Sequence, residues 1–300
     1  PIDHIIKKSG TPTMGGVIII IGIISSTILW ADLKNIYVWT LIFVSLSLGA
    51  LGLLDDILKI KLKNSSGLKS RYKFFGQLII STLALLILIK FANHQYLFDL
   101  YFPFFKNLIW HMGLFFIPFG LFVIIGASNA VNLTDGLDGL ATVPVMLVAL
   151  SFTLISYVVG NTIFSEYLQI QYIPDTGELS IFCGSIVGSC LGFLWYNAPP
   201  AKIFMGDTGS LSLGGSLAAI AIIVKHEIVL AIIGGLFVLE TVSVIIQVIS
   251  FKLTGKRIFK MAPIHHHFEK KGWPESTIVI RFWIIAIILA LVGLATLKLR

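Results

Sequence analysis

The chain has 300 residues, of which 56% are hydrophobic and only 12% are charged, and its mean hydropathy is +0.93. Soluble domains carry about 25% charged residues, so this composition excludes a soluble globular protein and indicates one that crosses a membrane several times. The net charge of +7 is compatible with nucleic-acid binding, but the basic residues follow a membrane topology instead, and we expect no nucleic-acid partner. No polar block is long enough for a second domain, so we expect one membrane-embedded domain over residues 1–300.

Nine apolar stretches are long enough to cross a bilayer as helices, which takes about 20 residues each. In chain order they are residues 14–31, 36–54, 74–92, 112–131, 137–159, 180–197, 209–224, 228–251 and 277–297. The stretch 209–224 is the shortest and is rich in Gly and Ser, which suit close helix contacts in lipid. The sequence therefore predicts an all-α polytopic integral membrane protein.

The Lys and Arg residues divide unevenly between the two sets of loops that these spans define. One set holds Lys7, Lys8, Lys59, Lys61, Lys63, Lys69, Arg71, Lys73, Lys202, Lys252, Lys256, Arg257, Lys260, Lys270, Lys271 and Arg281, and the other holds Lys34, Lys90, Lys106, Lys225, Lys298 and Arg300. Because cytoplasmic loops are enriched in basic residues, the richer set is predicted to face the cytoplasm.

Five polar segments fall on this predicted cytoplasmic side: residues 11–16, Asp55-Asp56, residues 129–139, residues 197–210 and residues 265–267. Their convergence predicts an active site at the membrane surface. A transporter would instead place polar residues at mid-depth in several spans. Glu240 and Gln247 fit that second pattern, and for them we expect a hydrogen bond between two buried helices.

Residues 129–139 carry two carboxylates between apolar runs, Asp135 and Asp138. A carboxylate beside hydrocarbon is costly and is usually functional. If a helix starts here, the three-residue spacing places both carboxylates on one side. The alternative is a polar turn in which Asp and Asn cap the second helix.

The pair Asp55-Asp56 ends a long apolar helix and precedes a run of basic residues. Adjacent side chains on a helix diverge by about 100°, so we expect different tasks for the two, such as metal binding and proton transfer or orientation. A charge cluster that fixes topology is the alternative, although acidic residues contribute little to topology.

Asp207 lies at a predicted helix start, where exposed N–H groups favour anions. A carboxylate for Mg²⁺ beside donors for phosphate is the combination that phosphoryl chemistry needs. The alternative is that Asp207 or Thr208 only caps the helix.

The internal triplet His265-His266-His267 cannot direct all three rings at one metal from a helix, but the rings can donate hydrogen bonds to phosphate. A zinc site is the sharper alternative, although its usual spacing is absent. Walker-type and dinucleotide patterns are absent from the sequence as well.

Together these motifs resemble the polyprenyl-phosphate N-acetylhexosamine-1-phosphate transferase superfamily, and within it the phospho-N-acetylmuramoyl-pentapeptide transferase family. The match is carried by Thr11-Pro-Thr-Met-Gly-Gly16, Asp55-Asp56 with Lys59, and the stretches 129–139, 197–210 and 265–269. The family has ten membrane helices, so we expect that the first of them is missing from the nine seen here. The resemblance implies transfer of phospho-MurNAc-pentapeptide from UDP to undecaprenyl phosphate, giving lipid I and UMP in cell-wall synthesis, with Mg²⁺ required.

The resemblance also implies roles for particular residues. Asp55, Asp56, Asp207, His265 and His266 are the expected catalytic residues, with Asp207 as the Mg²⁺ ligand and Asp55 as base or orienter of the lipid phosphate. The expected substrate-binding residues are Lys8, Thr13, Lys73, Asn132, Asp135, Gly136, Leu137, Asp138, Asn197, Phe204 and His267. The expected partners are UDP-MurNAc-pentapeptide, undecaprenyl phosphate, the lipid bilayer of a bacterial inner membrane, and a second copy in a homodimer.

Two other functions stay open at this point. One is a related transferase that uses another UDP-N-acetylhexosamine, and the other is a transporter or nucleotide-sugar-binding membrane protein without chemistry. The position of the carboxylates separates an enzyme from a transporter. An enzyme gathers its carboxylates at one face of the membrane, whereas a transporter places them at mid-depth.

Overall fold

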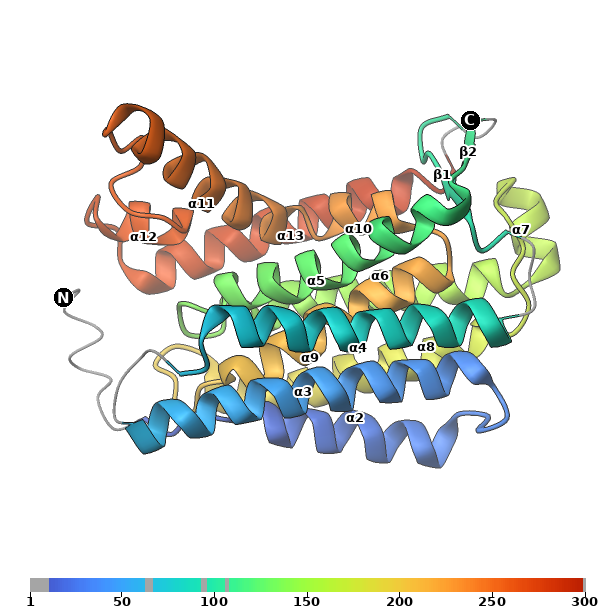
Figure 1. The fold of residues 1–300 in the computed structure, drawn as a ribbon, viewed down its shortest axis with the longest axis horizontal. Coiled ribbons are helices and arrows are strands. Elements are labelled where there is room, and N and C mark those ends of the chain that lie inside the picture. Colours follow the sequence, from blue (N-terminus) through green and yellow to red (C-terminus); the bar gives the residue numbers. More distant parts are fainter. Residues whose placement is uncertain (1–10, 63–66, 93–95, 106–107, 299–300) are drawn as a thin grey trace.

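The computed structural model describes residues 11–62, 67–92, 96–105 and 108–298. Its helices confirm the predicted all-α membrane architecture, and all nine predicted spans are present (Figure 1). The spans are α2 (Gly16–Trp30), α3 (Ile36–Leu62), α4 (Ser70–Phe91), α5 (Phe116–Thr134), α6 (Thr142–Val159), α8 (Leu179–Asn197), α9 (Gly206–Ile223), α10 (Glu227–Ile233) continued by α11 (Gly235–Thr254), and α13 (Glu275–Ala295). In the described residues, eight helices are long and apolar enough to cross a membrane, and α2 is a shorter apolar helix.

Short elements complete the chain. They are the helices α7 (Thr162–Leu168) and α12 (Ile264–Glu269), the 3-10 turns η1 (Gly113–Phe115) and η2 (Thr176–Glu178), and the strands β1 (Asp99–Tyr101) and β2 (Ile109–His111). The two strands form one antiparallel hairpin, in which Leu100 pairs with Trp110.

The short, small-residue span α9 is the centre of the bundle. In the apolar stretch of α9 that could cross a membrane, 89% of the residues are buried, whereas only 22% are buried in the corresponding stretch of α11. Small residues permit this position, because a Cβ on Gly16 of α2 would lie 2.1 Å from the backbone nitrogen of Gly209 on α9. Hydroxyl groups inside the contact are satisfied locally, as where Ser212 donates to the carbonyl of Ser45 over 2.8 Å. Close backbone approach, rather than large side chains, therefore fixes α9 among its neighbours.

The predicted single span 228–251 is broken at Gly234 into α10 and α11. The expectation of one continuous helix was wrong here, because the backbone of Gly234 leaves the helical conformation, with ψ at 18°. After the break, α11 diverges from the rest of the bundle toward the upper left of Figure 1. Its apolar side chains, including Ile249 and Leu253, are largely exposed, so this helix presents an apolar surface to its surroundings.

Two predicted boundaries move in ways that matter for the site. Helix α3 continues to Leu62, so Asp55 and Asp56 lie on the helix rather than at its end. Helix α5 extends to Thr134 and α6 begins at Thr142, so Asp135 and Asp138 lie in the turn between two helices. The expectation that a helix starts at residues 135–138 was therefore wrong, and the polar-turn alternative describes the backbone correctly.

The polar segments predicted to lie on one side do converge at one end of the bundle, at the left of Figure 1. That end holds the end of α3, the turn after α5, the start of α9 and helix α12. The opposite end carries α7 and the β-hairpin. There a buried ion pair joins Lys225 to Glu227 over 2.7 Å, and Lys225 also donates to the carbonyl of Leu97. The two ends are thus chemically different, with the carboxylate-rich segments at one of them.

We predict that Gly52→Ala destabilises the protein and lowers its activity, because the new Cβ would lie 2.2 Å from the carbonyl oxygen of Asp207. Overpacking of this kind costs about 1–3 kcal/mol, and it pushes α3 away from α9. The matched control is Gly188→Ala on α8, where no atom lies within 4 Å of the new Cβ and helix propensity favours Ala. Thermal unfolding of both variants in detergent measures the difference, and equal melting temperatures would contradict the packing argument.

Candidate active site

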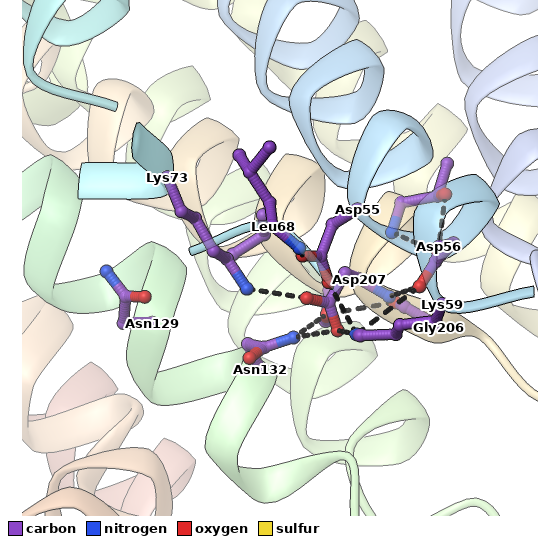
Figure 2. A network of polar contacts seen from close by, with 12 residues as sticks. Asp55, Asp56, Lys59, Leu68, Lys73, Asn129, Asn132, Gly206 and Asp207 are labelled. Carbon is purple, nitrogen blue, oxygen red and sulfur yellow. Dashed lines mark hydrogen bonds and ion pairs between the residues drawn. The ribbon is translucent and has the colours of Figure 1, made fainter. Parts of the chain in front are cut away.

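Three carboxylates meet at the polar end of the bundle. Asp55 and Asp56 come from α3 and Asp207 comes from the first turn of α9, and their ligand atoms lie within 4.8 Å of one another. Asp55 and Asp56 are 3% and 4% exposed, and Asp207 is partly exposed. Figure 2 shows the three side chains pointing toward a common centre. The close contact of α3 with α9 described above is what brings together residues 151 or more positions apart in sequence.

The two adjacent aspartates have different contacts, as their divergence on the helix predicts. Asp56 accepts hydrogen bonds from the backbone N–H groups of Asp207 and Thr208, at 3.2 and 3.0 Å, and from the Thr208 hydroxyl at 2.7 Å. It therefore caps the N-terminus of α9 from another helix, where its negative charge also meets the positive end of the helix dipole. Asp56 holds α9, and with it Asp207, in register with α3.

Because Asp56 takes the capping role, the alternative in which Asp207 is only a cap was wrong. The Asp207 carboxylate instead points away from the helix axis toward two ammonium groups. Its oxygens lie 3.1 Å from Nζ of Lys59 and 2.5 Å from Nζ of Lys73. Asn132 donates to the same carboxylate over 2.9 Å. Even with these contacts, the side chain of Asp207 is more exposed than those of Asp55 and Asp56.

Asp55 completes the charge arrangement. Its carboxylate lies 2.5 Å from Nζ of Lys59 and accepts a hydrogen bond from the backbone N–H of Leu68 over 2.6 Å. Lys59 also lies 3.7 Å from Asp56, so its ammonium group is surrounded by all three carboxylates. Two lysines thus face three carboxylates, which leaves a net negative charge of one unit if all five groups are ionised. A cation is therefore favoured at this position.

Two hollows open on either side of the carboxylates. A cavity of about 560 Å³ lies between α3, α4 and α5, and it is lined by Asp55, Lys59, Leu68, Ser70, Lys73, Phe74, Gln77, Asn129, Asn132 and Asp207. A second hollow of about 290 Å³ is lined by Thr13, Asp56, Lys59, Ile60, Gly206 and Asp207. Two different groups can therefore approach the carboxylates at once.

Asp135 joins the site from the turn after α5. Burial is the largest of the effects that raise the pKa of Asp135 well above its usual range, and the nearby charges of Asp207 and Asp56 act in the same direction. A hydrogen bond from the backbone N–H of Gly206 opposes them. A carboxyl group with a raised pKa holds its proton more readily and can then donate a hydrogen bond.

Two of the expected substrate-binding residues, Asp138 and Asn197, support the loop between α8 and α9. Asp138 is 2% exposed and accepts from the backbone N–H of Ala201 over 2.8 Å. Asn197 is equally buried, and its side chain donates to the carbonyl of Ile203 and accepts from Thr142. The structure therefore places Asp138 and Asn197 beneath the site rather than at its surface.

The expected residues Phe204, Leu137 and Thr13 have different surroundings. The backbone of Phe204 exchanges hydrogen bonds with the segment before α2, donating to Pro12 and accepting from Gly15. Leu137 is buried in an apolar cluster with Phe282 and Ile278, whereas Thr13 is exposed. Lys8 lies outside the described residues.

The three histidines contact three different partners. His265 is fully buried, with Nδ1 3.1 Å from Oε1 of Glu240. His266 is part-buried and lies 2.5 Å from Oε2 of Glu269. The Nδ1 atom of His267 accepts from the backbone N–H of Lys260. Desolvation, with the positive charges of Lys271 and Lys260, lowers the pKa of His267.

Glu240 and Gln247 share a face of α11, as expected. The expected contact between two buried helices is found for Glu240, which meets His265 of α12, whereas it was wrong for Gln247, whose partners lie in a loop. Gln247 accepts from the backbone N–H groups of Ile258 and Phe259 at 3.1 and 3.0 Å, and Glu240 meets His265. Both residues therefore tie α11 to the segment that carries the histidines.

Sequence reasoning gave no individual role to two residues that line the site. Lys59 contacts all three carboxylates, and its four-residue spacing from Asp55 on one helix was the available signal. Gln77 lines the larger cavity and accepts from Asn129 over 3.0 Å. No sequence pattern marked Gln77, because a single polar residue within an apolar span has many roles.

The fold and the site define a membrane-embedded transferase that handles phosphate groups, and comparison with known proteins agrees. Residues 38–225 match the model of glycosyl transferase family 4, and residues 8–20 match signature 1 of the phospho-N-acetylmuramoyl-pentapeptide-transferases. Two curated relatives carry that same name. The relative from Pelagibacter ubique (strain HTCC1062) is 67% identical over 300 residues, which is 100% of this chain and 83% of the relative. The relative from Phenylobacterium zucineum (strain HLK1) is 58% identical over 302 residues, covering 99% of this chain and 82% of the relative.

The chain belongs to the phospho-N-acetylmuramoyl-pentapeptide-transferase family, which confirms the resemblance drawn from its motifs.

We predict that Asp56→Ala lowers the stability of the protein more than Asp55→Ala does. Asp56→Ala removes three hydrogen bonds at the start of a buried helix, which should cost about 2 kcal/mol or more. Asp55→Ala removes one backbone contact and one lysine contact at the rim of a cavity. Thermal unfolding followed by tryptophan fluorescence measures both, and a lower melting temperature for Asp55→Ala would reverse the assignment.

Proposed function

We propose that this chain transfers phospho-N-acetylmuramoyl-pentapeptide from UDP-MurNAc-pentapeptide to undecaprenyl phosphate, giving lipid I and UMP in peptidoglycan synthesis. The observation that carries the proposal is the cluster of Asp55, Asp56 and Asp207 with Lys59 and Lys73, set at one end of a membrane bundle in a chain that matches this family over its whole length. A reaction between a polar nucleotide and a lipid requires a site where water and bilayer meet.

The residues present fit a magnesium ion. Mg²⁺ prefers oxygen ligands and is held by one or two carboxylates together with substrate phosphates. The cluster offers carboxylate oxygens from two helices, and the ammonium group of Lys59 already lies among them, which indicates that the position suits a cation. Asp207 would be the principal ligand, because it is the most exposed of the three carboxylates. When bound, the metal supplies charge neutralisation on the diphosphate of the donor.

The lipid acceptor fits the larger cavity. Lys73 and Asn132 line it, and the neighbouring ring of Phe74 is 50% exposed. A phosphate group would therefore meet an ammonium group, while its hydrocarbon chain continues past an apolar helix surface. The donor would then reach the carboxylates from the hollow lined by Thr13 and Gly206.

In the proposed reaction an oxygen of undecaprenyl phosphate attacks the phosphorus atom bonded to the sugar. The new oxygen–phosphorus bond forms as the bond to UMP breaks, and UMP leaves with the electron pair. Lys59 and Lys73 offset the negative charge that the two phosphate groups bring together. A phosphomonoester has a second pKa of about 6, so the acceptor is mostly ionised at pH 7 and Asp55 need only orient it through Lys59.

Two rival functions are less well supported. A transporter needs polar residues at mid-depth along a pathway. Here Asp55 and Asp56 lie in the last turns of α3 and Asp207 lies in the first turn of α9, which places the three carboxylates toward one end of the bundle (Figure 1). A transferase for another UDP-sugar shares the aspartates, but the signature matched at residues 8–20 belongs to the muramoyl-pentapeptide group. The expected homodimer stays a prediction.

The deciding assay is UMP release from UDP-MurNAc-pentapeptide by the purified protein with undecaprenyl phosphate, over a Mg²⁺ titration. We expect release to require both substrates and the metal. UDP-N-acetylglucosamine is the control donor, and release from it alone would favour the rival transferase. Binding of the donor without any release would favour the non-catalytic class.

We predict that Asp207→Asn lowers turnover about a hundredfold or more, because loss of a metal ligand removes several kcal/mol of transition-state stabilisation. The fold should survive, since Asn keeps the shape and Asp56 still caps α9. Asp32→Asn makes the same chemical change at an exposed position on the opposite end and should be silent. Near-normal turnover of Asp207→Asn with an unchanged Mg²⁺ dependence would remove Asp207 from the site.

We propose that the carboxylate end faces the cytoplasm, because the loops at that end hold most of the basic residues. An impermeant thiol reagent applied to intact cells should label Lys34→Cys and spare Lys256→Cys, both of which are exposed positions. Cys183 and Cys190 are buried and should give little background. Labelling of Lys256→Cys from outside, with Lys34→Cys protected, would invert the orientation.

A further inference from the structure

A buried acid and a buried imidazole meet where α11 touches α12. The side chains of Glu240 and His265 are 0% and 1% exposed, and Nδ1 of the imidazole lies 3.1 Å from Oε1 of the carboxylate. In the described part of the chain, neither the two carboxylate oxygens of Glu240 nor the two ring nitrogens of His265 have a partner in hydrogen-bonding geometry, so the close approach of Nδ1 to Oε1 is the polar contact that both side chains share. Each is therefore the available polar partner of the other, in a place where an unpaired polar group is costly.

The other side of the His265 ring lies against the turn that follows α5. A Cβ placed on Gly136 would lie 2.4 Å from Nε2 of His265, so only glycine allows the turn to come this close. The ring of His265 also lies 4.2 Å from that of His266, measured between centroids. The buried imidazole thus has three neighbours: Glu240, the turn at Gly136 and the more exposed ring of His266.

The contacts continue from this turn to the carboxylate cluster. Asp135 precedes Gly136 and accepts a hydrogen bond from the backbone N–H of Gly206, the first residue of α9. Asp207 follows directly. The position of the imidazole ring is therefore linked to the carboxylates through two backbone segments, Asp135–Gly136 and Gly206–Asp207. His265 itself is too deeply buried to touch a substrate.

We propose that Glu240 and His265 are positioning residues: Glu240 fixes the imidazole ring, and the ring sets the place of the Asp135–Gly136 turn and of His266 beside the donor substrate. The proposal rests on the function proposed above. An apolar pair would hold α12 against α11 with less desolvation cost. What a carboxylate and an imidazole add is direction, because a ring nitrogen must face a carboxylate oxygen.

The contact between Glu240 and His265 matters because α11 packs weakly against the rest of the bundle. This helix diverges from the bundle (Figure 1), and 22% of its span is buried. Apolar contacts alone therefore leave α12 free to shift along it. Gln247, two turns farther on, fastens residues 258 and 259 in the same way, which makes it a matched control on the same helix face.

The first test uses amide hydrogen exchange in the free protein, so it does not depend on the reaction. Glu240→Leu should speed exchange at least tenfold in residues 134–139 and 264–269. Gln247→Leu should speed exchange only in residues 256–260. Glu240→Gln keeps an oxygen that can accept from the imidazole and should stay within about threefold of the wild type. Unchanged exchange at residues 134–139 in Glu240→Leu would overturn the proposal.

The second test separates positioning from a merely structural role by kinetics. Glu240→Leu should raise KM for UDP-MurNAc-pentapeptide about tenfold and leave KM for undecaprenyl phosphate within about twofold, and Glu240→Gln should largely restore the donor KM. The double variant Glu240→Leu with His265→Leu removes both polar groups, so its melting temperature should recover while its donor KM stays high. Recovery of the donor KM together with the melting temperature, or an equal rise in both KM values, would show a structural role only and overturn the proposal.

These outcomes are distinct from failure of the proposed function. If the wild-type protein releases no UMP from UDP-MurNAc-pentapeptide, the function fails, and the exchange pattern still decides whether Glu240 and His265 hold the turn.

Discussion

The close approach of α3 to α9 is the constraint on which the rest of the site depends. Gly52 lets the backbone of Asp207 come near α3, and Asp56 then caps the first turn of α9 with three hydrogen bonds. Because α9 is the most enclosed span of the bundle, a displacement of its first turn would have to move several neighbouring helices. Asp207 is therefore held in place by the whole bundle, although it is itself partly exposed.

In this arrangement the adjacent residues Asp55 and Asp56 make different kinds of contact. Asp56 accepts its hydrogen bonds from the first turn of α9, two from backbone N–H groups and one from the Thr208 hydroxyl. Asp55 and Asp207 instead face lysines and the larger cavity. Lys59 and Lys73 hold the carboxylates together, and they are also the groups that would meet phosphate oxygens. The same charges can thus stabilise the folded site and receive the substrates, because ammonium groups on flexible side chains can move between carboxylate and phosphate.

The site also depends on parts of the chain that do not reach its surface. Asp138 and Asn197 hold the loop before α9 by bonds to backbone groups, and Glu240 with His265 backs the turn that carries Asp135. Polar residues in these motifs therefore serve two different purposes. Some face the cavities, and others replace the water that backbone groups in a buried loop would otherwise need.

The sequence by itself determined the nine spans, the family, and the gathering of the polar segments at one end, because hydrophobic length and motif order are local properties of the chain. It also predicted that Asp55 and Asp56 would diverge, since helix periodicity alone requires it. Only the tertiary structure decided which aspartate caps α9, that α11 breaks away at Gly234, and that His265 is buried against Glu240. Those outcomes depend on the partners that distant segments present to one another, and a linear pattern of residue types does not specify which partner a polar side chain will meet.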